Sequence, residues 1–467
     1  MSELPKGWKQ VEIGDVSKVV SGGTPKASIS ENFCEPSDGG HAWLTPADLS
    51  GYKHKMISHG RRNITDKGLK ESSAKLMPEG SILFSSRAPI GYVAIAENEI
   101  STNQGFKSFV FTDEVEPSYA YYYLKSIRDL AESWGTGTTF KELSGAKAKK
   151  LPFVYPSIEE QKRIADKLDS VLAKVEAAQA RLDKIPAILK RFRQSVLAAA
   201  TSGELTREWR NNHEAIVKNP TLGTEKINES IFRKASRSLP VIPSSWLIVP
   251  AGKVLEYVTS GSRGWSKYYS TNPNDALFLR MSNVRYDTTK LILSDLQYVD
   301  LPEKVEGKRS LVKLNDLVVS ITADVGRVAR ITEEITEAYI NQHLALLRPT
   351  SEINSEFLAM CIASTSIGIS QVNELKRGAT KAGLGLDDIR NLAIPLPSLA
   401  EQAEIVATVN KFFEQAFIVE KQYNAAKTRL DKLTQSILTK AFKGELLTNP
   451  VESEITEIEN SVEALNA

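Results

Sequence analysis

Cysteine and long apolar runs are both scarce in this sequence. The 467 residues contain only 2 cysteines, Cys34 and Cys361, which lie far apart and lack metal-ligand spacing. Two isolated cysteines argue against a disulfide framework and favour a reducing compartment. No run reaches the roughly 18 apolar residues that a membrane-spanning helix needs. The polar segment 1–8 lacks the apolar core of a signal peptide. We therefore expect a cytoplasmic protein.

An excess of charge of one sign is also missing. The net charge is +2, and basic and acidic residues nearly balance within both 1–155 and 241–395. Neither segment is a strongly basic body. Any binding of nucleic acid therefore has to depend on local clusters of cations rather than on bulk charge.

The signatures of common catalytic sites are absent as well. There is no G-x-x-x-x-G-K-[ST] phosphate loop, no Asn-Pro-Pro-aromatic motif and no glycine-rich S-adenosylmethionine loop. The 5 histidines are scattered and have no partners at metal-binding spacing. The E-x-K tripeptide at 306–308 resembles nuclease cores only as an isolated match, and Asp324 near Arg327 fits a surface ion pair. We expect no catalytic residue and no metal site in this chain.

What the chain does contain is an internal repeat. Pro156-Ser157-Ile158-Glu159-Glu160-Gln161 returns 241 residues later as Pro397-Ser398-Leu399-Ala400-Glu401-Gln402. The same offset relates Gln194-Ser195-Val196-Leu197 to Gln435-Ser436-Ile437-Leu438, and Gly203-Glu204-Leu205 to Gly444-Glu445-Leu446. About fifty residues therefore repeat without a gap, which indicates a duplicated module.

The region before each copy repeats more loosely. Leu4-Pro5-Lys6-Gly7-Trp8 resembles Ile242-Pro243-Ser244-Ser245-Trp246, and a Ser-Gly turn follows each, at 21–22 and 260–261. Ser85 and Gly91 have the spacing of Ser320 and Gly326, and Asn103-Gln104 matches Asn341-Gln342. The two lobes share a frame but differ in loop length, as expected of one scaffold that carries two recognition surfaces.

The closely repeated segments share a heptad pattern. Apolar residues recur at alternating spacings of four and three after Gln161, and again after Gln402. This pattern predicts two long amphipathic helices that pack on each other along a seam, and their outer faces could seat partner subunits. The predicted seam residues are Ile164, Leu168, Val171, Val175, Leu182, Leu189, Ile405, Val409, Phe412, Val419, Leu430 and Leu433.

Local signals predict how the two helices begin and end. A serine precedes a glutamate by three residues at 157–160 and at 398–401, which is the capping-box pattern. Gly203 and Gly444 suit the helix ends. Pro186 should kink the first helix, because proline removes a backbone hydrogen bond. Lys427 holds the matching position of the second helix, so that helix should be straighter.

The remaining sequence predicts two α+β lobes of roughly 150 residues. Short β-rich runs at 81–84, 92–95, 106–111, 317–321 and 344–347 predict strands, and 119–131 and 355–366 predict helices. We assign lobe 1 to 1–155, the first helix to 156–210, lobe 2 to 241–396 and the second helix to 397–447. The polar segment 211–240 is interpreted as a linker, and the acidic segment 448–467 as a mobile tail.

This arrangement resembles the specificity subunit of Type I restriction–modification systems over residues 4–447. The resemblance rests on the order lobe, helix, lobe, helix, on the Pro-Ser-x-x-Glu-Gln helix starts, and on Ile185-Pro186-Ala187-Ile188-Leu189-Lys190-Arg191-Phe192-Arg193-Gln194. The segments Leu4-Pro5-Lys6-Gly7-Trp8 and Gly203-Glu204-Leu205-Thr206 also fit.

The resemblance implies two target recognition domains related by a pseudo-twofold axis and separated by two long antiparallel helices. Each domain would read one half of an asymmetric, bipartite site in double-stranded DNA. Two modification (methyltransferase) subunits would supply S-adenosylmethionine chemistry, and restriction subunits would supply ATP- and Mg-dependent translocation and cleavage. The chain itself would hold no cofactor and catalyse nothing.

Candidate DNA contacts are polar and basic residues in glycine-flanked loops, because arginine and lysine read guanine, and asparagine and glutamine read adenine. In lobe 1 they are Thr24, Lys26, Ser85, Ser86, Arg87, Asn103, Gln104, Thr138, Thr139 and Lys141. In lobe 2 they are Arg263, Lys267, Arg280, Asn283, Thr322, Arg327, Lys376, Arg377 and Lys381. The alternative is that many of them only form turns.

Two further questions stay open at this level. Lys190, Arg191 and Arg193 form a basic patch that is a solvated face, a phosphate contact or a partner site. The nearly neutral lobes are also compatible with a coiled-coil scaffold that binds proteins and not DNA. Strongly salt-dependent DNA binding would exclude the scaffold. A third possibility, an unrecognised enzyme, would require DNA methylation or cleavage by this chain alone.

Overall fold

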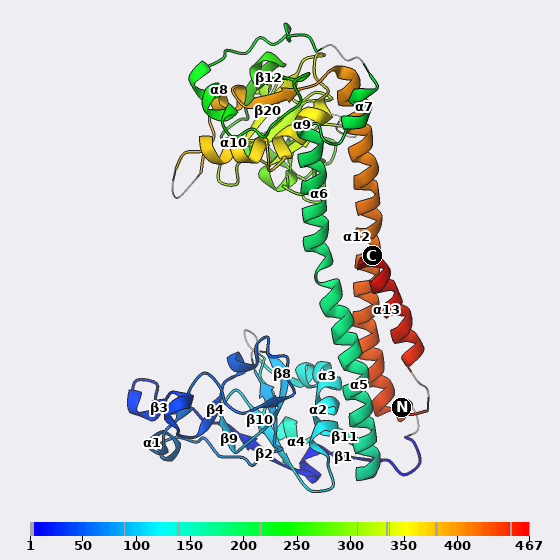
Figure 1. The fold of residues 1–467 in the computed structure, drawn as a ribbon. Helices are drawn as coiled ribbons and strands as arrows, with labels where there is room; N and C mark the ends of the chain where they lie inside the picture. The colour runs from blue at the N-terminus through cyan, green and yellow to red at the C-terminus, as the bar shows by residue number, and fades with distance from the viewer. Residues whose placement is uncertain are drawn as a thin grey trace. The chain divides into compact units, whose positions relative to one another are not determined.

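The protein is described by a computed structural model that covers residues 4–87, 89–137, 141–213, 217–305, 307–332, 335, 337–378, 382–448 and 451–466. The chain forms two compact units, Met1–Asp183 with Gln422–Ala467, and Lys184–Lys421. Each unit contains one lobe and a stretch of both long helical regions (Figure 1). The helices are therefore shared between the units, whereas the sequence suggested that they form segments of their own.

Lobe 1 is built on a five-stranded sheet in the order β2-β10-β7-β8-β5. Its strands are β2 (Ser17–Ser21), β10 (Lys107–Phe111), β7 (Ile82–Ser86), β8 (Ile90–Ala96) and β5 (Met56–Ile57). Three smaller pairs surround it: β1 (Lys9–Glu12) with β11 (Pro152–Tyr155), β3 (Phe33–Cys34) with β6 (Asn63–Ile64), and β4 (Ala42–Leu44) with β9 (Ile100–Thr102).

Lobe 2 repeats this topology with a four-stranded sheet in the order β13-β20-β17-β18. Its strands are β13 (Leu255–Ser260), β20 (Leu344–Pro349), β17 (Leu317–Ser320) and β18 (Val328–Arg330). A second sheet has the order β14-β16-β15-β19, and β12 pairs with β21. These strands are β14 (Tyr269–Ser270), β16 (Tyr298–Val299), β15 (Ala276–Leu279), β19 (Ala338–Ile340), β12 (Leu247–Pro250) and β21 (Ala393–Leu396).

The predicted strands and helices of the lobes are present, with shifted ends. Segment 119–131 forms two helices, α2 (Pro117–Ser126) and α3 (Arg128–Trp134), and segment 355–366 forms α9 (Ser355–Ala363), followed by α10 (Gly368–Leu375). Three single-turn helices complete the lobes: α1 (Asp66–Lys70), α4 (Gly145–Lys149) and α11 (Leu386–Arg390). In lobe 2 the buried sheet, α9 and the start of the last long helix share one hydrophobic core.

The long helices are α5 (Ile158–Leu182), α6 (Ile185–Thr201) and α12 (Leu399–Phe442). In Figure 1, α5 lies beside the last part of α12 within the first unit, and α6 lies beside the first part of α12 within the second unit. Of the predicted seam residues, Phe412 and Val419 are half-buried and all the others are buried. The heptad pattern therefore identified the packed faces, because burial of that stripe is what the pattern encodes.

The proline in the first helix interrupts it. α5 ends at Leu182 and α6 starts at Ile185, so Pro186 lies in the first turn of a new helix. In that turn its missing N–H has no helical partner to lose. The corresponding part of α12 continues without a break through Lys427, as its sequence predicted.

The segment interpreted as a linker contains one packed helix. α7 (Arg207–Asn211) precedes it, and α8 (Glu229–Ser236) lies within it. Ala235 is fully buried, and Phe232 packs against the core of lobe 2. The linker interpretation of 211–240 is therefore wrong for α8, whose few apolar residues are enough to dock one helical face.

The interpretation of 448–467 as a mobile tail is also wrong for most of its length. Glu452–Asn466 form helix α13, which packs against α5. Val451 and Ile455 are buried, and the acidic side chains find cations on the neighbouring helices. Among the helices that the structure describes, none is long and apolar enough to cross a bilayer.

Candidate DNA interface

A tryptophan–glutamate hydrogen bond ties each lobe to the start of its own long helix. Nε1 of Trp8 donates to Oε1 of Glu160 at 3.2 Å, and Nε1 of Trp246 donates to Oε2 of Glu401 at 2.9 Å. The serine half of each predicted capping box is present, because the backbone N–H of each glutamate donates to the serine hydroxyl. The glutamate side chains bind the indoles, which explains this part of the repeated motif.

The glutamine that follows has an equally specific role. Gln161 is fully buried; its Nε2 donates to the carbonyls of Pro156 and Glu114 at 3.0 and 2.8 Å, and its Oε1 accepts from Glu116 N. Gln402 repeats the pattern with Pro397 O at 2.9 Å and Asn354 N at 2.7 Å. The two glutamines fix the loops that enter α2 and α9.

The end of a long helix contacts the start of the lobe in the same unit. Gly444 has a φ of +75°, and a Cβ there would lie 2.5 Å from Pro5. Gly203 has a φ of +81°, and its Cβ would lie 2.5 Å from Pro243. Both the left-handed conformation and the close approach favour glycine. Each lobe is thus held from two sides, and its loops are presented by a rigid frame.

Two repeated serines build turns instead of contacting ligands. Ser85 Oγ donates to Pro89 O at 2.7 Å and accepts from Tyr92 N at 2.8 Å. Ser320 Oγ makes the same two bonds, to Asp324 O and from Arg327 N. Both side chains are fully buried. The interpretation of Ser85 as a DNA contact is therefore wrong.

The end of β7 at Ser86 lies beside two other predicted loops of lobe 1. Ser86 N donates to Gly105 O at 2.7 Å, and Leu143 N donates to Ser86 O at 2.8 Å. Glu142 lies 3.7 Å from Arg87 and 3.8 Å from Lys107 in ion pairs. Loop cluster 1, which we define as Arg87, Gln104, Lys107, Lys141 and Glu142, thus comes from three separate sequence segments.

Lobe 2 assembles the same three kinds of loop. Ala323 N donates to Ala382 O at 2.7 Å, and Leu384 N donates to Ile321 O at 2.9 Å. Ile321 N donates to His343 O at 2.9 Å. Loop cluster 2, defined as Thr322, Asp324, Arg327, Gln342 and Arg377, lies on this framework. The bridges that join these loops match those of lobe 1; Gln342 holds the position of Gln104, whereas Thr322 stands where lobe 1 has Arg87.

The predicted contact residues differ in how accessible they are to solvent. Exposed residues are Thr24, Lys26, Arg87, Gln104, Lys141, Arg263, Lys267, Lys376 and Arg377. Half-buried residues are Asn103, Arg280, Thr322 and Arg327. Buried residues are Ser85, Ser86 and Asn283. Thr138, Thr139 and Lys381 lie outside the described residues.

The buried members and the half-buried Asn103 correct the prediction. Ser86 is fully buried, and Asn283 donates to Ile292 O and Asp295 O from a site that is 1% exposed. These side chains are not available to DNA. Asn103 Oδ1 accepts from Gly105 N at 2.8 Å, which closes its turn. Asparagine in a glycine-flanked loop suits either role, so the sequence alone did not separate them.

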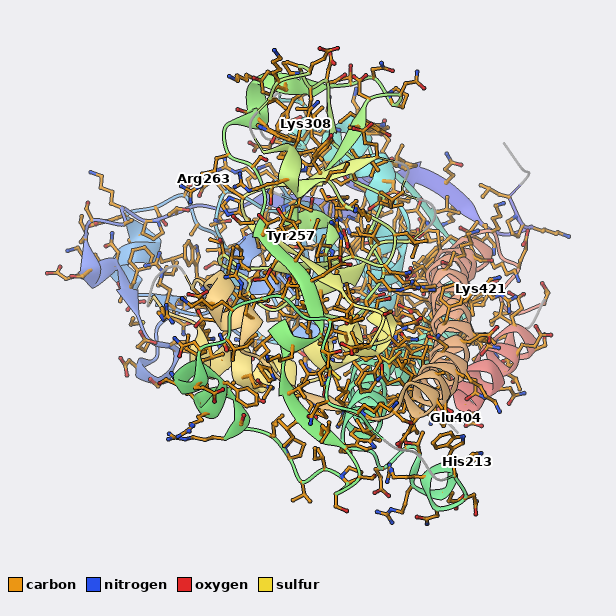
Figure 2. The ribbon with its side chains drawn as sticks, turned by 90° about the horizontal axis from the view of Figure 1, so that it is seen from above. His213, Tyr257, Arg263, Lys308, Glu404 and Lys421 are labelled. Carbon is orange, nitrogen blue, oxygen red and sulfur yellow. The ribbon has the colours of Figure 1, made fainter. Side chains whose placement is uncertain are left out.

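The structure also shows cations that the sequence did not single out. Lys107 pairs with the same glutamate as Arg87, Glu142, and 10% of its side chain is exposed. Lys308 and Arg263 lie on the same lobe (Figure 2), and Ser262 Oγ donates to Gly307 O at 3.2 Å beside them. No sequence spacing links 263 to 308, so only the fold brings these two cations together.

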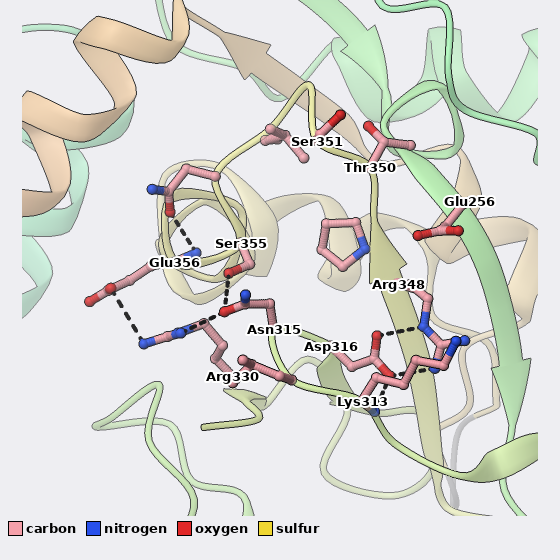
Figure 3. A pocket seen from close by; sticks show the side chains of 14 residues that line it. Glu256, Lys313, Asn315, Asp316, Arg330, Arg348, Thr350, Ser351, Ser355 and Glu356 are labelled. Carbon is pink, nitrogen blue, oxygen red and sulfur yellow. Dashed lines mark hydrogen bonds and ion pairs between the residues drawn. The ribbon is translucent and has the colours of Figure 1, made fainter. Parts of the chain in front are cut away.

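A polar cavity of about 500 Å³ lies elsewhere in lobe 2 (Figure 3). Arg348 binds Asp316 through two hydrogen bonds of 2.9 and 2.7 Å, and Arg330 lies 3.6 Å from Glu356. Burial raises the pKa of Asp316 even with Arg348 beside it. The charges here neutralise one another in pairs, so the cavity is unlike a binding site for a polyanion.

Metal binding finds no support in the part of the chain that the structure describes. No group of three or more histidine, cysteine, aspartate or glutamate side chains there could hold an ion. The predicted ion pair between Asp324 and Arg327 is present. Loop clusters 1 and 2 each bring amide and cationic side chains together on comparable frames.

Comparison with known proteins places these lobes and helices in one family. The family model "Type I restriction modification DNA specificity domain" matches residues 5–187 and 270–428. The Type I restriction enzyme StySPI specificity subunit of Salmonella potsdam is 30% identical over 95% of this chain and 90% of its own. The EcoKI specificity subunit of Escherichia coli K12 is 28% identical, with 95% and 90% covered.

Solved structures show the same fold. A chain from "Structural basis underlying complex assembly and conformational transition of the type I R-M system" has a TM-score of 0.66 at 18% identity and covers 96% of this chain and 100% of its own. The HsdS subunit from Thermoanaerobacter tengcongensis has a TM-score of 0.52 at 19% identity, with 95% and 98% covered. The chain therefore belongs to the DNA specificity subunits of Type I restriction–modification enzymes.

Proposed function

We propose that each lobe reads one half of an asymmetric bipartite DNA target through its loop cluster, and that the paired helices set the unread separation. The main support for this proposal is that the contacts holding each lobe to its helix are repeated, whereas the two sets of loops are not. The bonds of Trp8 and Trp246 to the helix starts are repeated, whereas the exposed loop residues differ. A repeated frame with different surfaces suits two different half-sites.

The chemistry of the loops supports readout of DNA. Arg87 and Gln104 in lobe 1, and Arg377 with Gln342 in lobe 2, supply the guanidinium and amide groups that recognise guanine and adenine edges. Exposed lysines such as Lys141 and Lys376 suit phosphate contacts, which orient a protein without reading sequence. Paired helices of fixed length then fix the distance between half-sites, as paired modules do in other DNA-binding proteins.

The remaining parts of the proposal concern partners. The chain contributes no catalytic group, and its helices dock two modification subunits that bring S-adenosylmethionine to adenine. Restriction subunits, with ATP and Mg, join that complex. Membership of the specificity-subunit family supports this division of labour, and long helices whose outer faces are exposed are suitable docking surfaces.

Methylation mapping tests the proposal directly. The chain and its modification subunit are expressed in a host without adenine methylation, and the modified bases are sequenced. We expect a single asymmetric motif with two half-sites and a fixed gap. A stable complex that methylates nothing, and binds DNA without dependence on salt, would instead support a protein-binding scaffold.

A further inference from the structure

A basic groove lies between lobe 2 and α6. It has a volume of about 480 Å³ and includes Lys190 and Arg193 from α6, Arg285 and Tyr286 from the loop after Asn283, and Arg327 from the turn before β18. These elements are far apart in sequence. The fold therefore brings four cations together in one groove, two from α6 and two from loops of lobe 2.

The charge of the groove is not balanced by the described residues. Arg193 pairs with Glu420 at 2.7 Å, and Arg327 pairs with Asp324. Lys190 and Arg285 are exposed and form no ion pair within the described part of the chain. Asp287 is the one acid among the residues that line the groove. The groove is consequently prepared for an anionic ligand.

The side chains around the groove are held in place. The guanidinium of Arg327 lies 4.9 Å from the centre of the Tyr286 ring, and the Tyr286 hydroxyl donates to Val325 O at 3.0 Å. Gln194 Oε1 accepts from Thr365 N at 3.2 Å, which fixes α6 against the loop between α9 and α10. Arg327 is thus fixed before a ligand binds, and a pre-ordered cation loses little conformational entropy when it contacts an anion.

The groove is continuous with loop cluster 2 through Arg327. That residue belongs to both, and its backbone N–H is held by the turn-forming Ser320. A ligand that contacts the loop cluster therefore has the groove at its edge. This continuity favours the DNA backbone over a separate acidic protein segment.

The equivalent groove of the first unit has different chemistry. It includes Gln435, which matches Gln194 in the repeat, and has a volume of about 950 Å³. Three cations line it, together with three acids: Lys53, Lys125, Arg128, Asp129, Glu176 and Asp183. The positive excess is thus a property of the second unit, and not a by-product of the duplicated frame.

We infer that the groove of the second unit binds phosphates of the DNA backbone that flanks the half-site read by lobe 2. This inference rests on the proposed function. Lys190 and Arg285 make the new phosphate contacts, with Arg327 linking them to the loop cluster. Phosphate contacts set position and affinity without reading bases, so these residues should leave the recognised sequence unchanged.

The test compares two doubly substituted chains, each assembled with the modification subunit. K190Q/R285Q removes the unpaired cations of the groove. R191Q/K290Q removes the same charge from exposed residues of the same two regions that do not line the groove. Affinity for a duplex carrying the mapped target is measured between 0.05 and 0.3 M salt. Each phosphate contact contributes about 0.9 to the slope of log K against log salt.

For K190Q/R285Q we expect the slope of log K against log salt to become shallower by about 1 to 2. Affinity at 0.1 M salt should fall roughly tenfold for each lost contact. R191Q/K290Q should change neither. A duplex with neutral methylphosphonates beside the second half-site should weaken binding of the native complex and leave binding of K190Q/R285Q unaffected. The methylated motif should be identical in all three complexes.

Two results would overturn the inference. One is equal affinity and slope for the two double variants. The other is weaker assembly with the modification subunit at unchanged DNA affinity, which would assign the groove to a protein partner. If the native complex itself methylates no motif, the proposed function fails first, and the groove assignment fails with it.

Discussion

The indole of Trp246 and the carboxylate of Glu401 form a hydrogen bond of 2.9 Å in a site where Glu401 is 1% exposed. The same carboxylate accepts from Thr206 Oγ1 at 2.8 Å and from Nε of Arg210 at 2.9 Å. One buried glutamate therefore joins the start of lobe 2, the start of α12 and the segment after α6. Glu160 in the first unit is half-buried. Within the described part of the chain, its carboxylate accepts one hydrogen bond, from Trp8.

This difference predicts unequal effects of one substitution in the two copies. Glu401→Ala leaves Arg210 without its buried partner, which should cost about 3 to 5 kcal/mol of unfolding free energy. Glu160→Ala removes one bond of 3.2 Å and should cost about 1 kcal/mol. Urea unfolding of both variants measures the difference. Equal losses would contradict the proposed role of the buried cluster.

Proline should act oppositely in the two long helices. Pro186→Ala should change unfolding free energy by less than about 1 kcal/mol, because Pro186 lies in the first turn of α6. Lys427→Pro should cost about 3 kcal/mol or more, since position 427 is inside the unbroken α12. Thermal unfolding and circular dichroism at 222 nm measure both. A costly Pro186→Ala would show that the break itself is required.

Adjacent cations in loop 376–377 should have different roles. Arg377 binds Asp388, but 72% of the Arg377 side chain is exposed to solvent, so Arg377→Ala should destabilise the fold by no more than about 1 kcal/mol. Lys376 is exposed and bonds only the Asn373 amide among the described side chains. Lys376→Ala should leave stability unchanged and weaken binding to all DNA sequences equally. A change of the methylated motif by Lys376→Ala would identify it as a base contact.

Gln104 offers a test of the assignment of lobes to half-sites. Its side chain is exposed and pairs with Thr24. If it reads a base, Gln104→Ala should relax the methylated motif at one position of one half-site, with a loss of about 1 to 3 kcal/mol of discrimination. The other half-site serves as the internal control. Relaxation in both halves would argue against independent lobes.

Helix α13 should detach at high salt or low pH. It is joined to α5 and α12 by Lys167–Glu452, Arg181–Glu463 and Lys440–Glu454, and exposed pairs of this kind contribute about 0.2 to 1 kcal/mol each. The hydrogen bond with Lys167 lowers the pKa of Glu452 below its ordinary 4.5. The Lys167–Glu452 pair therefore stabilises the docked α13 fully above pH 4.5, and this stabilisation is lost as the pH falls through the lowered pKa of Glu452.

Hydrogen exchange of the amides of 452–466 measures this detachment. We expect lower protection factors, relative to the intrinsic exchange rate at the same pH, in 1 M salt and below pH 4, with α5 and α12 still protected. Val451 and Ile455 are buried without charge, so their burial should be insensitive to salt. Unchanged protection of α13 in 1 M salt would mean that apolar packing alone holds it.

The regular parts of the fold were predictable from local pattern. The heptad pattern predicted the buried seam residues of both long helical regions, because apolar residues at helical spacing lie on the buried face of a helix. Pro186 gave the break because its backbone cannot complete the helix. The repeat also predicted that both lobes share a frame, which the matching strand orders confirm.

The contact residues were harder to predict, because polarity in a loop has two causes. Ser85 and Asn283 look like ligands in sequence, yet they satisfy backbone groups inside the turns. Their role depends on which strand lies behind the loop. Arg285 was missed because only the packing of lobe 2 on α6 brings it to Lys190. Helix α8 was missed because its short apolar face is recognisable only with its receiving surface.

The two units also differ in how they arise during synthesis. The second unit is one continuous stretch, Lys184–Lys421, whereas the first needs both Met1–Asp183 and Gln422–Ala467. At about 5 to 20 residues per second, the ribosome takes roughly 10 to 50 s to pass from the end of α5 to the end of α12. During that interval Leu168, Val171 and Val175 have no α12 to cover them. The unit whose translation begins first is therefore completed last, and until then one face of α5 is left open to chaperones or to premature pairing with another copy.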